Sequence, residues 1–503
     1  MAKLMDFDKA LEMFEPVIGL EVHVELNTAT KMFSPAPNPA ASLEDFAPNT
    51  AISPVCLGLP GSLPVVNEQA IRSSISLGLA LGCQIAQTSR FARKNYFYPD
   101  LAKNYQISQY DEPIAFDGMV EVELEDQTLW SVDIERAHME EDAGKLTHIG
   151  GDTGRIHGAE YSLVDYNRAG VPLVEIVTRP IVGAGERAPE LARAYVQTIR
   201  DIVLSLGVSQ ARMERGNLRC DANVSLRPKG QSEFGTRTET KNVNSFRSIE
   251  RAVRYEIQRQ AALLAAGESI TQETRHWHED TGQTSPGRPK SDADDYRYFP
   301  EPDLLPVTPD PALLDELRAQ LPEPPVARRR RLRDDWALPA MDFQAIVNAG
   351  MLDDVEATIA LGTSAQAAKK WWLGEISRIA NEREVEPRTL VSPEQVAQLE
   401  NSVQSGVIND KIARDVLSRM IEGEGTPEEI IEKNAMAVVS DDSALLAAID
   451  EALANDPDVM QKIQEGKVQA AGAVIGQVMK ALGGQADAKR VRELILERAG
   501  QSG

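Results

Sequence analysis

The stretch from Ile18 to Leu26 alternates apolar and polar side chains with a period of two, the pattern of a half-buried β-strand. One face carries only Leu and Val, and the other carries Glu21, His23 and Glu25. Side chains on one face of a strand lie roughly 7 Å apart, and carboxylates with one imidazole suit a divalent cation. The stretch therefore predicts a strand at a metal site, although a solvated strand face would show the same alternation.

Charge and cysteine content narrow the class of protein. The 503 residues include 53 Lys and Arg against 77 Asp and Glu, a net charge of −24, which argues against broad nonspecific binding to nucleic acid but leaves room for local basic patches. The three cysteines, Cys56, Cys83 and Cys220, lie too far apart for a disulfide framework. Without a signal-peptide pattern or a long apolar run, we expect a cytoplasmic protein with no membrane contact.

The first 305 residues mix short alternating runs with a few amphipathic segments, which predicts an α+β domain built on an antiparallel sheet. We expect helices over Glu68–Leu81, Gly185–Leu206 and Ser245–Ala266. Beyond a Pro-rich linker the chain becomes rich in Ala, Glu, Leu and Gln. We expect two all-α domains there, at 306–425 and 426–503, separated by a second Gly-rich linker.

Two further segments place carboxylates where a cation would neutralise them. His138 precedes three consecutive acidic residues that include Glu140 and Glu141, and Glu175 lies inside an apolar strand. Buried carboxylates are costly unless they are paired or bind a metal. An exposed acidic turn at the first segment and a structural ion pair at the second are the alternatives, and the pattern does not decide which of Glu140 and Glu141 faces a site.

Two later segments carry both signs of charge on one strand face. Alternation places Arg219, Asp221 and Asn223 together, and it groups Arg237, Glu239 and Lys241 in the same way. Such faces could hold phosphates through a bridging metal. Exposed strands with cross-strand ion pairs would show the same sequence.

Aromatic and cationic residues are interleaved between Phe91 and Tyr110, where Arg93, Lys94 and Lys103 lie among six aromatic rings. This composition suits a base or a sugar-phosphate, although a tyrosine-rich core loop is the alternative. Further along, we expect a mobile loop over Thr281–Ser291, followed by Arg297 between two tyrosines. The chain has neither a P-loop nor a dinucleotide-binding fingerprint, so the inventory favours metal-assisted phosphoryl transfer on an open antiparallel sheet.

Five motifs together resemble those of the GatB/GatE family, subunits of tRNA-dependent amidotransferases, and the resemblance runs along essentially the whole chain. The motifs are Gly19–Leu26, Arg93–Asp100, His138–Gly144, Leu218–Ser225 and Asp294–Pro302. The resemblance implies a cradle domain similar to glutamine synthetase and guanido kinases, a helical domain, and a tRNA-contacting tail similar to YqeY proteins. The tail contains Gly466–Gly472, a basic turn before an apolar helix.

The resemblance also implies an activity. The family phosphorylates the side-chain carboxylate of Glu-tRNA(Gln) or Asp-tRNA(Asn) with ATP and Mg²⁺, and ammonia then displaces the phosphate. A glutaminase subunit, GatA, supplies the ammonia, and a small subunit, GatC, completes a heterotrimer. The absence of an amidase-like Ser/Lys arrangement agrees with a chain that receives its ammonia from elsewhere.

The resemblance assigns roles to particular residues. It places metal ligands at Glu21, His23, Glu140 or Glu141, Glu175, Asp221 and Glu239. Our own candidates for contacts to phosphate or to the aminoacyl group are Lys94, Arg168, Arg219, Arg237, Lys241 and Arg297. Contacts to ATP fall to Lys94, Asn95, Tyr96 and Lys241.

Two features modify the family pattern. Many members carry a four-cysteine zinc knuckle after the first strand, but here the corresponding positions keep only Cys56, and Ser34 and Ser53 replace two of the others. We therefore expect no structural zinc. Because the chain is acidic overall, tRNA contacts would have to be local, at the arginines of 328–333, at Lys369–Trp372 or in the tail, unless these are solvated helix faces.

Two other functions remain compatible with the residues. The chain could be a tRNA-holding scaffold whose acidic strands are structural, or an ammonia ligase that acts on a small metabolite without tRNA. Loss of tRNA-dependent ATP hydrolysis in Glu21→Ala or His23→Ala would distinguish an amidotransferase subunit from the scaffold. Turnover without tRNA would indicate the ligase.

Overall fold

The computed structural model describes residues 4–42, 45–150, 158–289, 296–438, 442–455, 457–464, 468–482 and 485–499. It consists of two compact units, Met1–Arg328 and Arg329–Gly503. The predicted division into three domains, at 305 and 425, stays a prediction. In the structure the helix α5, Pro311–Ala319, belongs to the first unit, because its buried Leu317 packs in the same apolar core as the sheet.

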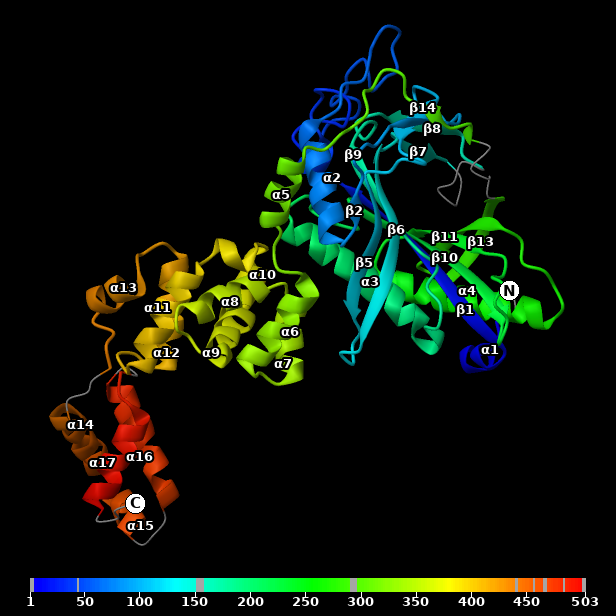
Figure 1. The fold of residues 1–503 in the computed structure, drawn as a ribbon. Coiled ribbons are helices and arrows are strands. Elements are labelled where there is room, and N and C mark those ends of the chain that lie inside the picture. The colour runs from blue at the N-terminus through cyan, green and yellow to red at the C-terminus, as the bar shows by residue number, and fades with distance from the viewer. Residues whose placement is uncertain are drawn as a thin grey trace. The chain divides into compact units, whose positions relative to one another are not determined.

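A nine-stranded sheet forms the body of the first unit (Figure 1). Its strand order is β13-β12-β11-β10-β1-β9-β6-β5-β2, and neighbouring strands are antiparallel except β11 and β12. The strands span β1 Phe14–Glu25, β2 Gln84–Ile85, β5 Ala115–Glu123, β6 Leu129–Glu141, β9 Pro172–Thr178, β10 Leu218–Pro228, β11 Thr238–Val243, β12 Glu273–His278 and β13 Gln283–Pro289. The α+β prediction is confirmed, and the sheet is antiparallel apart from that one pair.

Helices cover the apolar face of this sheet. Leu20, Val22 and Val24 of β1 are buried in a core that also takes in side chains of α3, Ala188–Ser205, and α4, Phe246–Ala265. The helix α2, Glu68–Ala80, packs on β5 and β6, and the short α1 spans Phe7–Met13. The three helices predicted from periodicity are therefore confirmed. Their apolar sides pack on the apolar face of the sheet, and the opposite face carries the polar side chains of β1.

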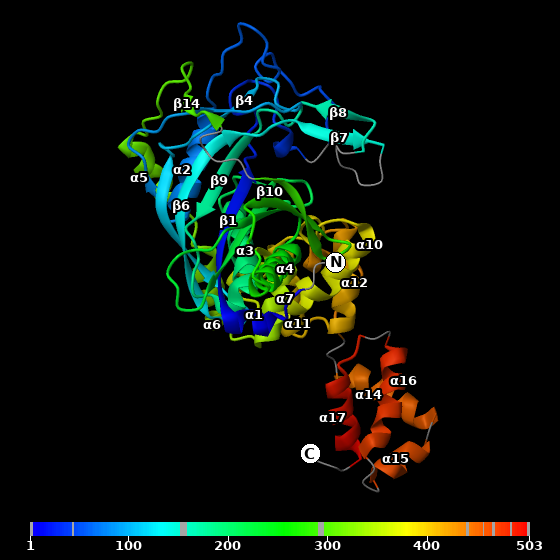
Figure 2. The ribbon, with the colours of Figure 1, turned by 90° about the vertical axis from the view of Figure 1, so that its right-hand side faces the viewer.

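Two small sheets lie at one end of the large sheet (Figures 1 and 2). One has the order β14-β3-β4, with β3 Ala92–Asn95, β4 Tyr105–Ser108 and β14 Phe299–Pro300. The other pairs β7, Lys145–Ile149, with β8, Tyr161–Asp165. The aromatic segment between Phe91 and Tyr110 thus forms a hairpin, and the segment after residue 295 returns to pair with it.

The mobile loop predicted at Thr281–Ser291 is wrong over most of its length. Residues 283–289 form β13, which pairs antiparallel with β12 at the edge of the large sheet. Its Pro286 and Gly287 read as loop residues in the sequence, but an edge strand tolerates a proline because one side of its backbone has no partner strand. Residues 290 and 291 lie outside the described residues, as do Asp294 and Asp295 of the last motif.

The second unit is helical. The helix α6, Pro325–Trp336, begins before the boundary between the units. The helices that follow are α7 Ala340–Asn348, α8 Leu352–Ala360, α9 Ala365–Lys370, α10 Ser377–Arg383, α11 Pro393–Gln404, α12 Asp410–Ile421, α13 Pro427–Lys433, α14 Asp442–Asn455, α15 Pro457–Gln464, α16 Ala471–Ala481 and α17 Ala488–Arg498. A six-residue π-helix, Trp371–Ile376, joins α9 to α10.

Two separate apolar cores support these helices. One contains side chains from α7 to α13, and the other contains side chains from α14 to α17. Among the described residues, no helix has the length and apolar character needed to cross a membrane.

Candidate active site

Strand register brings the predicted site residues into two neighbouring rows on the polar face of the large sheet. In one row, His23 of β1 lies opposite Glu175 of β9 and Arg219 of β10. In the next row, Glu21 lies opposite Asp221 of β10. Because side chains alternate between faces, residues opposite each other on paired strands point to the same side.

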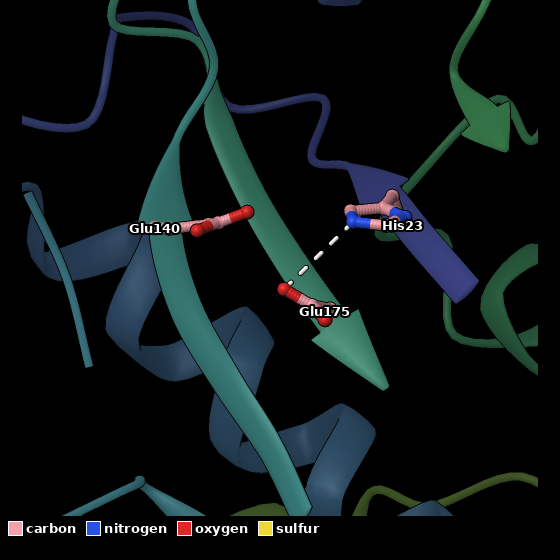
Figure 3. A group of neighbouring side chains, drawn as sticks. All are labelled: His23, Glu140 and Glu175. Carbon is pink, nitrogen blue, oxygen red and sulfur yellow. Dashed lines mark ion pairs between the residues drawn. The ribbon is translucent and has the colours of Figure 1, made fainter. Parts of the chain in front are cut away.

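The first group consists of His23, Glu140 and Glu175, which come from β1, β6 and β9 (Figure 3). One ligand atom of each lies within 4.8 Å of the others. His23 Nε2 is 3.7 Å from Glu175 Oε2, and His138 Nε2 is 3.3 Å from the same oxygen. Burial raises the pKa of Glu175, but His138, His23 and the Lys94 charge outweigh it and hold that pKa well below its ordinary value.

The donor set of this group fits a divalent cation. Glu140 is only 3% exposed. Its Oε2 is buried and accepts no hydrogen bond from any described residue. A buried carboxylate oxygen without a partner is costly, and a bound ion would remove that cost. Two carboxylates and one imidazole are ligands that a magnesium or manganese ion accepts.

The second group consists of Glu21, Asp221 and Glu239, from β1, β10 and β11. Lys241 Nζ lies 2.7 Å from Asp221 and 3.6 Å from Glu239. Asn223 donates to Glu21 at 2.8 Å. This group therefore combines three carboxylates with a cation on the same face, an arrangement that could hold a second ion and a phosphate together.

The two lysines stay protonated in this acidic setting. Burial lowers the pKa of Lys94, but the carboxylates of Glu140 and Glu175 raise it above its ordinary value. Burial likewise lowers the pKa of Lys241, but the charges of Asp221 and Glu239 outweigh burial and raise that pKa above its ordinary value. Both side chains therefore present a fixed positive charge beside the carboxylates.

The choice left open between Glu140 and Glu141 is decided by the geometry of β6. Glu140 points into the first group, whereas the Glu141 carboxylate pairs with Lys103 and accepts a hydrogen bond from the Ile107 amide at 3.0 Å. Adjacent residues on a strand face opposite sides. We therefore remove Glu141 from the candidate ligands.

Two arginines that were expected to contact phosphate also have contacts within the protein, and the expectation stays a prediction. Arg168 donates to the backbone oxygens of Ala143 and Gly144 at 3.0 and 2.8 Å. Arg219 pairs with Asp142, just beyond the end of β6. Both side chains fix the segment that follows Glu141, so they act on the shape of the site.

The remaining candidates lie at the rim. Asn95 donates to the backbone oxygen of Arg297 at 2.8 Å, which joins β3 to the segment before β14. Tyr96 donates to Gln106 at 3.2 Å. The Arg297 side chain is exposed, and its residue adopts a left-handed φ of 45°. Arg237 is exposed as well and lines a groove next to Glu21.

That groove has a volume of about 190 Å³ and continues along the polar face beyond Glu21. It is lined by Gly19, Asn223 and Ser225 from the sheet, together with Phe234 and Arg237. Phe234 is 55% exposed. The groove therefore offers an aromatic ring and a cation directly beside the second acidic group.

Glu25, the third polar residue of the alternating pattern in β1, is buried and is not among the metal ligands that the family resemblance assigned. It lies on the same strand face as Glu21 and His23 and accepts a hydrogen bond from Asn217 at 2.9 Å. Burial and the neighbouring Asp142 charge raise its pKa to about 8. The signal was present in the alternation of β1, but the sequence could not show that Asp142 lies beside it.

The stretch compared with a zinc knuckle forms a packed cluster. The Cys56 sulfur lies 3.6 Å from Ser34 Oγ and 3.3 Å from Ser53 Oγ, and Lys31 Nζ approaches it to 3.6 Å. The expectation of no structural zinc stays a prediction.

One proposed tRNA surface is not available for stacking. Trp371 and Trp372 are buried, and their indole nitrogens donate to Glu400 and Thr358. The lysines before them pair with acidic residues, Lys369 with Asp342 and Lys370 with Asp410, both at 2.7 Å. These residues are therefore core and helix-surface groups.

In the arginine-rich segment 328–333, two side chains have contacts within the protein. Arg331 pairs with Glu356 at 3.1 Å, and the guanidinium of Arg333 lies over the ring of Phe343. Gly466 and Lys467 of the tail turn lie outside the described residues.

Comparison with known proteins agrees with this geometry. Residues 16–315 match the model of the GatB/GatE catalytic domain, and residues 353–498 match that of a GatB domain. Relatives named as the B subunit of aspartyl/glutamyl-tRNA(Asn/Gln) amidotransferase include those of Clavibacter michiganensis, 68% identical with 99% of both chains covered, and Leifsonia xyli, 67% identical over the full length of both. The relative from Streptomyces avermitilis bears the same name and is 59% identical, with 99% of this chain and 98% of its own covered. The chain belongs to the GatB/GatE family.

Proposed function

We propose that this chain is the subunit of a tRNA-dependent amidotransferase that activates a carboxylate for amidation. Its substrates are the side chains of Glu-tRNA(Gln) and Asp-tRNA(Asn), in keeping with the names of its relatives. The observation that carries the proposal is the first acidic group, with its buried and unpartnered Glu140 oxygen beside the Lys94 charge.

The reaction needs two steps. A side-chain carboxylate oxygen attacks the γ-phosphorus of ATP, ADP leaves, and an acyl phosphate forms. Ammonia then attacks the carbonyl carbon, the C–O bond to phosphate breaks, and the amide remains after loss of a proton. Both steps are limited by charge and by position, so catalysis needs no nucleophile from the protein.

The side chains on the polar face have matching tasks. Magnesium, when bound, would neutralise charge on the phosphates, and His23, Glu140, Glu175 and the second acidic group would hold it. Lys94 and Lys241 supply fixed positive charge beside the reacting oxygens. Arg168 and Arg219 hold the segment after β6 in place.

The groove beside Glu21 fits the nucleoside of ATP. With a rise of about 3.3 Å per residue, Gly19 and Val17 lie roughly 7 and 13 Å along β1 from the Glu21 row. A base in the groove would therefore leave the phosphates near the acidic groups, with Phe234 beside the ring and Arg237 beside the phosphates. Replacing Phe234 by Ala would then raise the KM for ATP and leave the KM for tRNA unchanged.

The remaining expectations from the family resemblance form part of the proposal. The cradle is similar to glutamine synthetase and guanido kinases, the tail is a YqeY-like tRNA-contacting domain, and the chain acts in the cytoplasm. An amidase subunit, GatA, supplies ammonia from glutamine, and a small subunit, GatC, completes the heterotrimer. The word "subunit" in the names of the relatives supports a multi-subunit enzyme.

The experiment is ATP hydrolysis by the reconstituted complex with misacylated tRNA. His23→Ala and Glu21→Ala each remove one ligand from a group, and we expect a loss on the order of 100-fold or more with no change in the circular dichroism spectrum. Glu121→Gln is the matched control, because Glu121 is an exposed carboxylate on β5 of the same sheet.

Three outcomes would contradict the proposal. Full amidation by both ligand variants would make the chain a tRNA-holding scaffold. Turnover of ATP and ammonia without any tRNA would indicate a metabolite ligase. An equal loss in Glu121→Gln would mean that the effect does not come from the two acidic groups.

A further inference from the structure

A fully buried lysine lies behind the candidate site and has no part in the proposed chemistry. Lys31 has no solvent-exposed surface. Its Nζ donates to the backbone oxygens of Ala169 at 2.6 Å and Tyr166 at 3.4 Å, and to the sulfur of Cys56 at 3.6 Å. An ammonium has three protons, so these three acceptors match its donors one for one.

The sulfur is surrounded by hydrogen-bonding groups in the same way, and either atom can be the donor in its contacts with the two serine hydroxyls. Cys56 is 6% exposed, and the hydroxyls of Ser53 and Ser34 lie 3.3 and 3.6 Å from it, besides the Lys31 ammonium. A thiolate accepts from all three donors, whereas a thiol would use its own proton on one of them. A lone buried ammonium would be costly, and a thiolate beside it removes that cost.

We infer that Lys31 and Cys56 form a buried ammonium–thiolate pair, and that Lys31 is a positioning residue for the turn that carries Arg168. The pair is new relative to the proposed function, and only its positioning role depends on that function. The two carbonyls held by Lys31 flank Arg168, and Arg168 in turn holds Ala143 and Gly144, just after the strand that carries Glu140.

The surroundings of the pair agree with this inference. Burial raises the pKa of the Cys56 thiol, but Ser53, Lys31 and Ser34 outweigh burial and bring that pKa below its ordinary value. Burial brings the pKa of Lys31 below its ordinary value, although the charges of Cys56, Glu141 and Asp165 oppose that effect. Gly170 has a φ of 86°, and a Cβ there would lie 3.5 Å from Lys31 Cδ and 3.8 Å from the sulfur.

The other two cysteines provide internal controls. Burial raises the pKa of Cys83 to about 12 and holds that of Cys220 well above its ordinary value. Of the three cysteines, Cys56 is therefore the one whose thiolate should form at the lowest pH.

The first test is a pH titration of the far-ultraviolet thiolate absorption of the full-length chain. We expect one thiolate per chain at neutral pH, lost in Cys56→Ser and kept in Cys83→Ser. In Lys31→Met the absorption should appear only at a more alkaline pH. The ion pair would be overturned if the wild type and Cys56→Ser absorb equally at neutral pH, and this result does not depend on what the chain does.

The second test separates positioning from simple stability. In the complex, Lys31→Met should lower kcat by about 10- to 100-fold, as for residues that orient a functional group through a neighbour. The double variant Lys31→Met/Cys56→Ala removes both charges, so it should regain thermal stability relative to Lys31→Met but keep the low kcat, because the two carbonyls still lack their donor. Full recovery of kcat in the double variant would overturn the positioning role.

Discussion

Single residues on β6 show how one position in a strand changes the partners of a buried carboxylate. Glu140 and Glu141 are both buried carboxylates, yet Glu140 joins His23 and Glu175 while Glu141 pairs with Lys103. The alternation of a strand predicts that one of the two faces the site. Which one it is depends on the register of β6 against β9, where His138 lies opposite Glu175. That register is set by packing at long range, so the sequence left it open.

These neighbours provide a matched pair of variants. Glu140→Gln should lower tRNA-dependent ATP hydrolysis by about 100-fold or more, because it removes a charged ligand from the first group. Glu141→Gln should keep activity but lower the free energy of unfolding by about 2–4 kcal/mol, because it leaves the partly buried Lys103 ammonium without its charge partner. Steady-state kinetics and denaturant unfolding measure the two effects, and a reversed pattern would contradict the assignment.

At the scale of elements, helix signals in the sequence were easier to interpret than strand pairings. Asn67 is the N-cap of α2, and Ser245 is the N-cap of α4. Both side chains accept hydrogen bonds from backbone amides of the first helical turn, as Asn and Ser commonly do. In contrast, β13 contains Pro286 and Gly287 and reads as a loop. Its identity as a strand comes from pairing with β12, an interaction between segments that the local sequence does not encode.

The edge of the sheet depends on one buried carboxylate of α4. Glu256 is fully buried, and it pairs with Arg259 on the same helix and with Arg275 on β12. Thr284 on β13 donates to it as well. We expect Glu256→Gln to destabilise the first unit by about 3–5 kcal/mol, since the buried Arg259 guanidinium loses its counter-charge and Arg275 keeps only its pair with Glu273. Glu268→Gln, an exposed site just after α4, should change stability by less than about 0.5 kcal/mol.

The same residue gives a pH dependence with a defined sign. Burial raises the pKa of Glu256, but Arg259, Thr284 and Arg275 outweigh it and bring that pKa below the ordinary value of 4.5. A carboxylate with a lowered folded-state pKa contributes stability that is fully present above its unfolded pKa and lost as the pH falls through the folded value. Thermal unfolding scans below pH 4.5 should therefore show a weaker acid dependence in Glu256→Gln than in the wild type, and equal slopes would contradict this account.

At the scale of the whole molecule, composition gave the broad outline correctly. The chain has a net charge of −24, and several of its carboxylates lie around Lys94 and Lys241 on one face of the large sheet. Composition left Lys369–Trp372 open between a tRNA contact and a solvated helix face, because a basic and aromatic run looks the same whether its rings are buried or exposed. Only the packing of Trp371 and Trp372 against the helical core shows that they are structural.

The tail has a core of its own, formed by α14 to α17 and separate from the core of α7 to α13. A chain that ends at residue 438 should keep the fold of the first unit. If the tail contacts tRNA as proposed, the truncated complex should show a raised KM for tRNA and a nearly unchanged kcat at saturating tRNA. An unchanged KM would assign tRNA binding to another part of the complex.

The most direct test of the central claim is a titration of the chain with Mn²⁺, followed by electron paramagnetic resonance. The account predicts tight binding that is lost at one site in Glu175→Gln and retained in Glu121→Gln, because only Glu175 belongs to the first acidic group. If Glu175→Gln binds Mn²⁺ with the same stoichiometry and affinity as the wild type, the group of His23, Glu140 and Glu175 is not a metal site.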